Sequence, residues 1–317
     1  MPSDYHLSPD SLRRTVQTLA RDIGERNGHH PEALERAAAW VESELAATGL
    51  PVRRLPVVVP DGAPFHCGSR TLWNLDAAKT GATRANEVIV IGAHYDSKVA
   101  TPGWHDHGPP QPHRPGTPGA NDNASGVAAV LALARAFAGT PTARTLRFVA
   151  FVNEEPPYYQ TETMGSLVYA RMCAAEPGVR VVGMFTPETI GCYSVRPRTK
   201  RLRAASLIGL PVRPDYVAFL THWGARRFTR SCADLFARSC PVPVRVAALP
   251  RLHRRVAWSD DWSFWETGVP AFAVTDTAFL RHDDYHELDD TPDTLDYPQM
   301  AAVVDGLRHM LAALANP

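Results

Sequence analysis

The sequence predicts an α/β protein, in which a mixed, mostly parallel sheet forms the middle layer of a three-layer α/β/α sandwich. Short apolar runs alternate with helical patterns along the 317 residues, and this alternation is typical of a sheet covered by helices on both faces. Three of the runs are apolar nearly throughout, as central strands are. The predicted strands are 57–59, 71–75, 88–91, 145–152, 179–185, 216–220, 244–248 and 271–275.

A helical segment at residues 8–49 precedes the first predicted strand. Pro9 begins a pattern whose apolar residues recur every three or four positions as far as Ile23, which is the period of an amphipathic helix. Pro31 begins a second pattern, and Gly49 can end it, because proline favours the first turn of a helix and glycine its end.

The composition argues against a disordered chain and against a nucleic-acid-binding protein. Hydrophobic residues make up 44% and charged residues 21%, with 33 basic and 33 acidic side chains. The chain therefore has no excess of positive charge that would attract a polyanion over long distances. No basic leader followed by an apolar core opens the sequence, and no run of about 18 apolar residues follows. We expect one soluble, cytoplasmic domain over residues 1–317, with no membrane or nucleic-acid partner.

The five cysteines indicate neither a disulfide framework nor a thiolate metal site, because their number is odd and no C-x-x-C is present. A bridge between Cys232 and Cys240 stays open as an alternative.

Histidine and glutamate residues follow the three most apolar strands at the points where they end. His94 comes after the first of these runs, Glu154 after the second and Glu188 after the third. Ligands of open α/β sheets bind beyond the carboxyl ends of the strands. We therefore expect these side chains to meet at one edge of the sheet.

Two of these strand ends carry paired side chains. Burial of even one uncompensated carboxylate costs several kcal/mol, so Glu154 and Glu155 indicate a nearby cation. One of them could bind a metal while the other faces substrate as a base, since neighbours on an extended chain point in different directions. His94 and Asp96 lie on one side of an extended segment, where Asp96 can orient the ring. Taken alone, a solvated acidic turn or a hydrogen-bonded histidine would also explain these pairs.

Two further residues, Asp122 and His286, complete the candidate site. Asp122 lies among turn-forming residues directly before the apolar helical stretch 126–134, at a junction that must be buried. A helix N-cap would also explain Asp122, and a surface loop would explain Glu188 or His286 singly. None of these alternatives explains why all of them occur together.

The charge of the set predicts the number of metal ions. Four carboxylates would be neutralised by two divalent cations about 3.5–4 Å apart, with one carboxylate as a bridge. Mixed histidine and carboxylate ligands suit zinc, and manganese or cobalt also fit them. The four carboxylates are Asp122, Glu154, Glu155 and Glu188.

Several motifs resemble the co-catalytic dizinc aminopeptidases, metallopeptidase family 28, and the resemblance extends over residues 88–307. It implies a zinc-exopeptidase-like fold and a peptide or aminoacyl substrate, from which the N-terminal residue is hydrolysed. The motifs are 92–97 (GAHYDS), 118–126 (PGANDNASG), 153–156 (NEEP), 259–260 (SD), 268–270 (GVP) and 285–286 (YH).

The resemblance also implies a role for each matching residue. Asp122 would bridge two zinc ions. His94 and Glu188 would complete the ligands of one ion, and Glu155 and His286 those of the other.

The remaining matching residues would take part in catalysis or hold the ligands in place. Glu154 would be the general base and Tyr285 an oxyanion donor. Asp96 would orient His94, and Asp260 would support the ligands from behind.

Two departures and two alternatives accompany this resemblance. Many relatives have aspartate where this chain has Glu188, and the segment 99–118, rich in proline, glycine and histidine, is extended. A glutaminyl cyclase, a single-zinc aminoacyltransferase of similar fold, is the alternative within enzymes, because its His-Tyr-Asp-Ser-Lys segment resembles 94–98. A non-catalytic binding module of the same fold is the second, although the intact ligand set and base argue against it.

Overall fold

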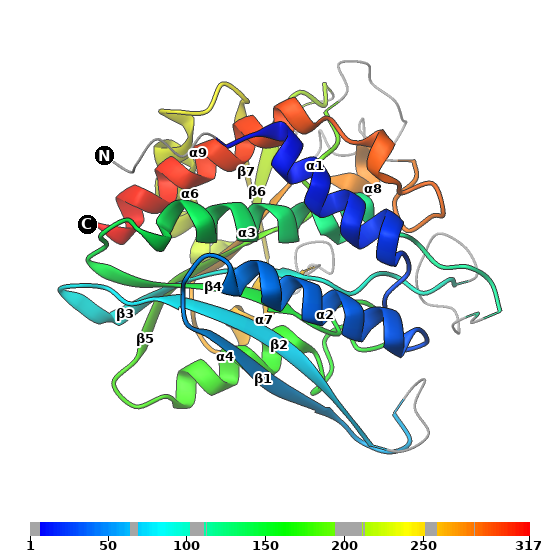
Figure 1. The fold of residues 1–317 in the computed structure, drawn as a ribbon. Helices are drawn as coiled ribbons and strands as arrows, with labels where there is room; N and C mark the ends of the chain where they lie inside the picture. The colour runs from blue at the N-terminus through cyan, green and yellow to red at the C-terminus, as the bar shows by residue number, and fades with distance from the viewer. Residues whose placement is uncertain are drawn as a thin grey trace.

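The computed structural model describes residues 7–63, 69–101, 111, 113–193, 211, 213–250, 259–281 and 283–317. Its centre is an eight-stranded sheet of order β1-β2-β4-β3-β5-β8-β6-β7 (Figure 1). Four neighbouring pairs are parallel and three are antiparallel. In chain order the strands are β1 (Val52–Val59), β2 (Arg70–Lys79), β3 (Arg84–His94), β4 (Arg144–Phe151), β5 (Arg180–Pro187), β6 (Val217–His222), β7 (Val244–Leu249) and β8 (Ala271–Thr275).

Helices cover both faces of this sheet, which confirms the predicted α/β/α sandwich. α4 and α7 lie on one face, and α1, α2, α3, α6 and α9 lie on the other (Figure 1). The α-helices are α1 (Pro9–Gln17), α2 (Pro31–Ala46), α3 (Ser125–Ala138), α4 (Gly165–Ala175), α6 (Arg226–Ala237), α7 (Asp261–Glu266), α8 (Ala278–Arg281) and α9 (Tyr297–Ala315), with π-helical turns η1 (Thr18–Ile23) and η2 (Ala120–Ala124) and 3₁₀ turns η4 (Trp223–Ala225) and η5 (Pro292–Thr294).

The central strand β3 shows why its sequence is apolar without interruption. Val88 and Val90 pack into the core beneath α4 and α7, whereas Ile89 and Ile91 pack into the larger core beneath α3. Successive side chains of a strand point to opposite faces, so a strand between two helical layers needs apolar residues at every position.

The N-terminal segment begins with α1, whose Ser8 hydroxyl caps the helix by accepting from the Asp10 N–H at 3.2 Å. α2 starts at Pro31, and the chain leaves it through Gly49, whose φ of 79° is in the left-handed region. The connection between η1 and α2, residues 24–30, passes beside the carboxyl end of β3, where the Ser97 N–H donates to the Arg26 carbonyl at 3.0 Å.

The alternative of a Cys232–Cys240 bridge is wrong, because both thiols are free. Half of the extended segment 99–118, namely residues 102–110 and 112, lies outside the described residues. Within the described part of the chain, no helix has both the length and the apolar character needed to cross a membrane.

Candidate metal centre

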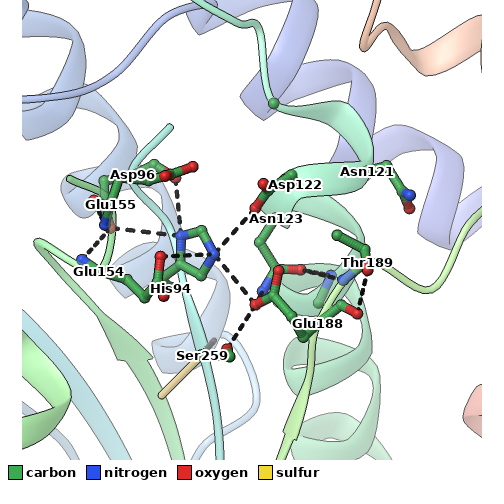
Figure 2. Close-up of polar contacts among 12 residues, drawn as sticks. His94, Asp96, Asn121, Asp122, Asn123, Glu154, Glu155, Glu188, Thr189 and Ser259 are labelled. Carbon is green, nitrogen blue, oxygen red and sulfur yellow. Dashed lines mark hydrogen bonds and ion pairs between the residues drawn. The ribbon is translucent and has the colours of Figure 1, made fainter. Parts of the chain in front are cut away.

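The sheet topology brings the candidate ligands to one edge. β3 pairs in parallel with β4 on one side and with β5 on the other, so the three carboxyl ends lie next to each other. His94 is the last residue of β3, Glu154 and Glu155 follow β4, and Glu188 follows β5. Asp122 joins them from η2 (Figure 2).

The first cluster consists of His94, Asp122 and Glu188. His94 Nε2 lies 3.2 Å from Asp122 Oδ1 and 3.3 Å from Glu188 Oε2. One potential ligand atom from each residue lies within 4.8 Å of the others, a compact arrangement that a single cation can span.

A second cluster shares Asp122 with the first. His286 Nε2 lies 2.9 Å from Asp122 Oδ2 and 3.7 Å from Glu155 Oε1. The two oxygens of the Asp122 carboxylate therefore face different histidines, and these three residues also lie within 4.8 Å of one another. The described residues thus hold two candidate cation positions with one carboxylate between them.

The carboxylates of the centre are buried and outnumber the cationic groups beside them. Burial raises the pKa of Glu155 to about 8 and that of Glu154 well above its usual value. Burial opposes ionisation of Asp122 as well, but the imidazoles of His286 and His94 beside its carboxylate hold its pKa below the usual range. Such crowding of buried acids is stable only with compensating charge, and divalent cations would supply it.

Two ligand atoms at this centre lack a hydrogen-bond partner among the described residues, namely His94 Nε2 and Glu155 Oε1. The other ring nitrogen of His94, Nδ1, lies 3.2 Å from the Asp96 carbonyl oxygen. Because a carbonyl can only accept, Nδ1 carries the proton and Nε2 keeps its lone pair. The donor set therefore fits a metal ion.

Asp96 contacts the turn after β4 as well as the His94 ring. Its carboxylate accepts the backbone N–H groups of Glu154 at 3.2 Å and Glu155 at 3.1 Å, while its Oδ1 lies 3.6 Å from His94 Nδ1. The nearer contact with the ring is the Asp96 carbonyl. The carboxylate thus holds the turn after β4, which Asn153 enters with a left-handed φ of 60°, a conformation that asparagine tolerates.

Glu188, the departure from the family pattern, is held by two neutral donors. Ser259 Oγ donates to its Oε2 at 2.8 Å, and Asn123 Nδ2 donates to the same oxygen at 2.9 Å (Figure 2). Asp260, which follows Ser259 in the chain, is fully buried, and burial raises its pKa to about 7.

Asp290 also supports the centre, and no sequence pattern predicted it. Its carboxylate accepts the backbone N–H groups of Asn121 at 2.8 Å and Asp122 at 3.1 Å, which fixes the loop that carries Asp122. Burial raises the pKa of Asp290 to about 7. Asp290 belongs to a run of acidic residues after His286, and nothing local distinguishes it from its exposed neighbours.

Tyr285 lies against the second cluster. Its ring stacks on the ring of His286, with centroids 3.7 Å apart and planes 21° apart. This contact keeps the tyrosine beside a candidate ligand.

Comparisons of the sequence identify relatives over most of its length. The sequence profile of peptidase family M28 matches residues 74–311. The uncharacterized protein YfbL of Escherichia coli K12 is 32% identical over 307 residues, which cover 96% of this chain and 88% of YfbL. A probable zinc metalloprotease of Pyrenophora teres f. teres is 27% identical over 296 residues, 85% of this chain but only 57% of that protein.

Solved structures with this fold include two classes of enzyme. A glutaminyl cyclase of Fimbriiglobus ruber superposes with a TM-score of 0.69 at 20% identity, covering 97% of this chain and 96% of its own. The zinc aminopeptidase BSAP of Bacillus subtilis superposes with a TM-score of 0.68 at 14% identity, covering 98% and 96%. At these identities the likeness shows the fold alone. The profile match and the YfbL identity carry the assignment: this chain belongs to peptidase family M28.

Proposed function

We propose that this peptidase is an aminopeptidase that works with two zinc ions and removes N-terminal residues from peptides. The observation that carries the proposal is the pair of three-residue clusters that share Asp122. Zinc is favoured because mixed histidine and carboxylate ligands suit it and because two relatives are described as zinc enzymes. Manganese and cobalt fit the same ligands.

One ion would be held by His94 and Glu188 and the other by Glu155 and His286, with Asp122 binding both. When bound, the ions would polarise the scissile carbonyl and lower the pKa of water towards about 7.

Glu154 is the proposed general base. It belongs to neither cluster of ligands, yet its Oε2 lies 3.7 Å from His94 Nε2, so its carboxylate lies beside the ligands without being one of them. The carboxylate would take a proton from the attacking water and return it to the leaving amine nitrogen. One carboxylate thus serves both proton transfers, and it ends each cycle ionised.

Tyr285 and Asp96 would complete the machinery. The Tyr285 hydroxyl would donate to the carbonyl oxygen as negative charge develops on it. Asp96 would hold Glu154 and Glu155 through their backbone N–H groups.

Glutaminyl cyclase is the second candidate function. A cyclase superposes as well as the aminopeptidases do, and the segment 94–98 resembles that of cyclases. Those enzymes use a single zinc, however, and two clusters that share one carboxylate favour a two-metal site.

Measuring both reactions and the metal content separates these functions. Metal-free protein would be titrated with zinc, and each sample assayed for release of aniline from a panel of aminoacyl anilides and for pyroglutamate formation from a peptide with N-terminal glutamine. We expect anilide hydrolysis that peaks near two ions per chain. Cyclisation with one ion per chain would establish the cyclase instead, and absence of both metal and turnover would point to a binding module.

A further inference from the structure

Arg26 is a fully buried arginine in the connection between η1 and α2, outside every motif of the metal centre. All its side-chain nitrogens donate to backbone carbonyl oxygens. The acceptors are Tyr95 at 2.6 Å from Nε, Gly119 at 2.9 Å from Nη2, and Pro118 at 2.5 Å, Gly24 at 3.2 Å and Leu19 at 3.3 Å from Nη1.

Three of these carbonyls belong to the two loops that carry metal-site residues. Tyr95 lies between His94 and Asp96 at the end of β3. Pro118 and Gly119 precede Asp122 in the loop that enters η2. The planar guanidinium therefore joins the β3 end to the η2 loop, and its fork of donors sets their separation.

Neighbouring residues of the connection hold the same two loops. The Arg26 N–H donates to Ser97 Oγ at 3.0 Å, and Asn27 Nδ2 donates to the Ser97 carbonyl at 3.1 Å. Glu25 Oε2 accepts the Gly116 N–H at 2.6 Å. Residues 24–27 thus form a clamp, with one set of contacts to the β3 end and another to the η2 loop.

Gly119 allows the loop to come this close. Its φ is 64°, and a Cβ there would lie 2.3 Å from the Asp122 carbonyl oxygen and 3.3 Å from Arg26 Nη2. The loop therefore folds back on Asp122 where it meets the guanidinium.

The charge of Arg26 also suits this place. Burial lowers the pKa of its guanidinium to about 10, which leaves it charged at neutral pH, and the carboxylates of Asp96, Asp290, Asp122 and Glu155 act in the opposite direction. A permanent cation behind the site offsets part of the buried negative charge without occupying a ligand position.

We infer that Arg26 is a positioning residue of the metal centre, which keeps Asp122 at the correct distance from His94 by clamping the two loops that carry them. The inference rests on the proposed two-metal function. A lysine would keep the charge, but one ammonium cannot reproduce the fork of donors that reaches both loops.

The test compares R26K with R36K as a matched control, because Arg36 is an exposed arginine of α2 that donates to the Ile23 carbonyl at 3.4 Å. For each protein, cobalt and zinc affinities would be measured by competition with a chelator, together with the visible spectrum of bound cobalt. We expect R26K to lose about tenfold or more in affinity for at least one ion, as outer partners of metal ligands do, with an altered cobalt spectrum. R36K should match the wild type.

Kinetics and a second variant complete the test. R26K should lose kcat on an aminoacyl anilide while KM changes little, because ligand geometry rather than the substrate pocket is altered. If R26K lacks the native far-UV circular dichroism, E25A decides, since it removes the carboxylate that accepts from the Gly116 N–H and from Asn27 Nδ2 and that pairs with His30. Weaker metal binding in E25A supports the clamp. Wild-type metal affinity in folded R26K, or in E25A when R26K does not fold, would overturn the inference that Arg26 positions the metal ligands. A wild type that binds two ions but cleaves no anilide would refute the proposed function while leaving this comparison intact.

Discussion

Glu154 and Glu155 are adjacent in the chain, but their carboxylates face different histidines. Glu154 Oε2 lies 3.7 Å from His94 Nε2, and Glu155 Oε1 lies 3.7 Å from His286 Nε2. Only Glu155 belongs to a cluster that could hold an ion. Neighbouring side chains can therefore divide ligation and proton transfer between them.

Substitution of the proposed base tests this division. E154Q keeps the size of the side chain but cannot accept a proton, so we expect kcat to fall by about 10²-fold or more while two metal ions stay bound. E162Q is a suitable control, because Glu162 is exposed in the same loop and pairs with Arg171. Metal loss in E154Q, measured by elemental analysis, or unchanged turnover would refute the assigned role.

Asp276 provides a prediction on pH and stability. It is fully buried, its Oδ2 accepts from Asn121 Nδ2 at 3.0 Å and from the Cys192 N–H at 2.6 Å, and burial raises its pKa to about 7. An acid whose folded pKa is raised binds its proton more tightly in the folded state. Its contribution to stability is therefore present below about pH 4 and is lost as pH rises towards 7.

The variant D276N should remove this contribution to the pH dependence. Asparagine keeps an acceptor oxygen but does not ionise, so between pH 5 and 6.5 the free energy of unfolding of the metal-free variant should fall less steeply than in the wild type. The difference should approach about 1.4 kcal/mol per pH unit. Urea unfolding at several pH values measures both slopes, and equal slopes would contradict the prediction.

At the scale of elements, close packing beside β3 depends on a glycine. Gly92 lies two residues before His94, and a Cβ there would lie 2.2 Å from a ring carbon of Phe151. The ring cannot move aside easily, because Phe151 packs against Tyr169 and Phe264 at centroid distances of 5.5 and 6.4 Å. Phe151 and Phe264 both lie in the core beneath α4 and α7, which leaves the Phe151 ring little room to move.

We expect G92A to lower the free energy of unfolding by about 1–3 kcal/mol, as overpacking does, and to reduce activity by shifting His94. G139A serves as the control, because a Cβ at Gly139 would meet nothing within 4 Å, and it should change stability by less than about 0.5 kcal/mol. Chemical denaturation of both variants tests the contrast, and equal stabilities would show that the Phe151 ring adjusts freely.

The sequence predicted all eight strands, but the predicted bounds missed strand residues that lie outside the apolar runs. The β4 prediction, 145–152, differs by one residue at each end from Arg144–Phe151. The β1 prediction, 57–59, misses the first five residues of Val52–Val59, where the adjacent Arg53 and Arg54 interrupt the apolar residues. Edge and antiparallel strands carry polar residues on their exposed positions, so an apolar run marks only part of them.

For the site, the sequence revealed the residues that follow a local pattern and missed those whose role depends on distant contacts. His94, Glu154 and Glu188 could be predicted because each follows an apolar strand. Arg26 and Asp290 could not, because they act on backbone groups about 70–170 positions away in the chain. Contacts of that kind are specified by the tertiary fold and leave no local pattern.

At the scale of the whole molecule, the metal centre is a meeting point of distant parts of the chain. β3, β4 and β5 contribute from the middle of the sheet, η2 from the start of α3, and His286 from the segment between α8 and α9. Buried like charges at such a junction oppose folding. Bound cations should therefore stabilise the whole fold as well as the site.

Metal removal tests this coupling. A ligand that binds only the folded state adds about 2.7 kcal/mol of stability when its free concentration is a hundredfold above Kd, so zinc should raise the Tm of the metal-free protein by several degrees. D122N weakens the shared ligand of both clusters, and its Tm should respond far less to zinc. H286A spares the first cluster and should retain part of the response. A full Tm shift in D122N would mean that zinc stabilises the fold from somewhere other than this centre, because no ion position proposed here is independent of Asp122.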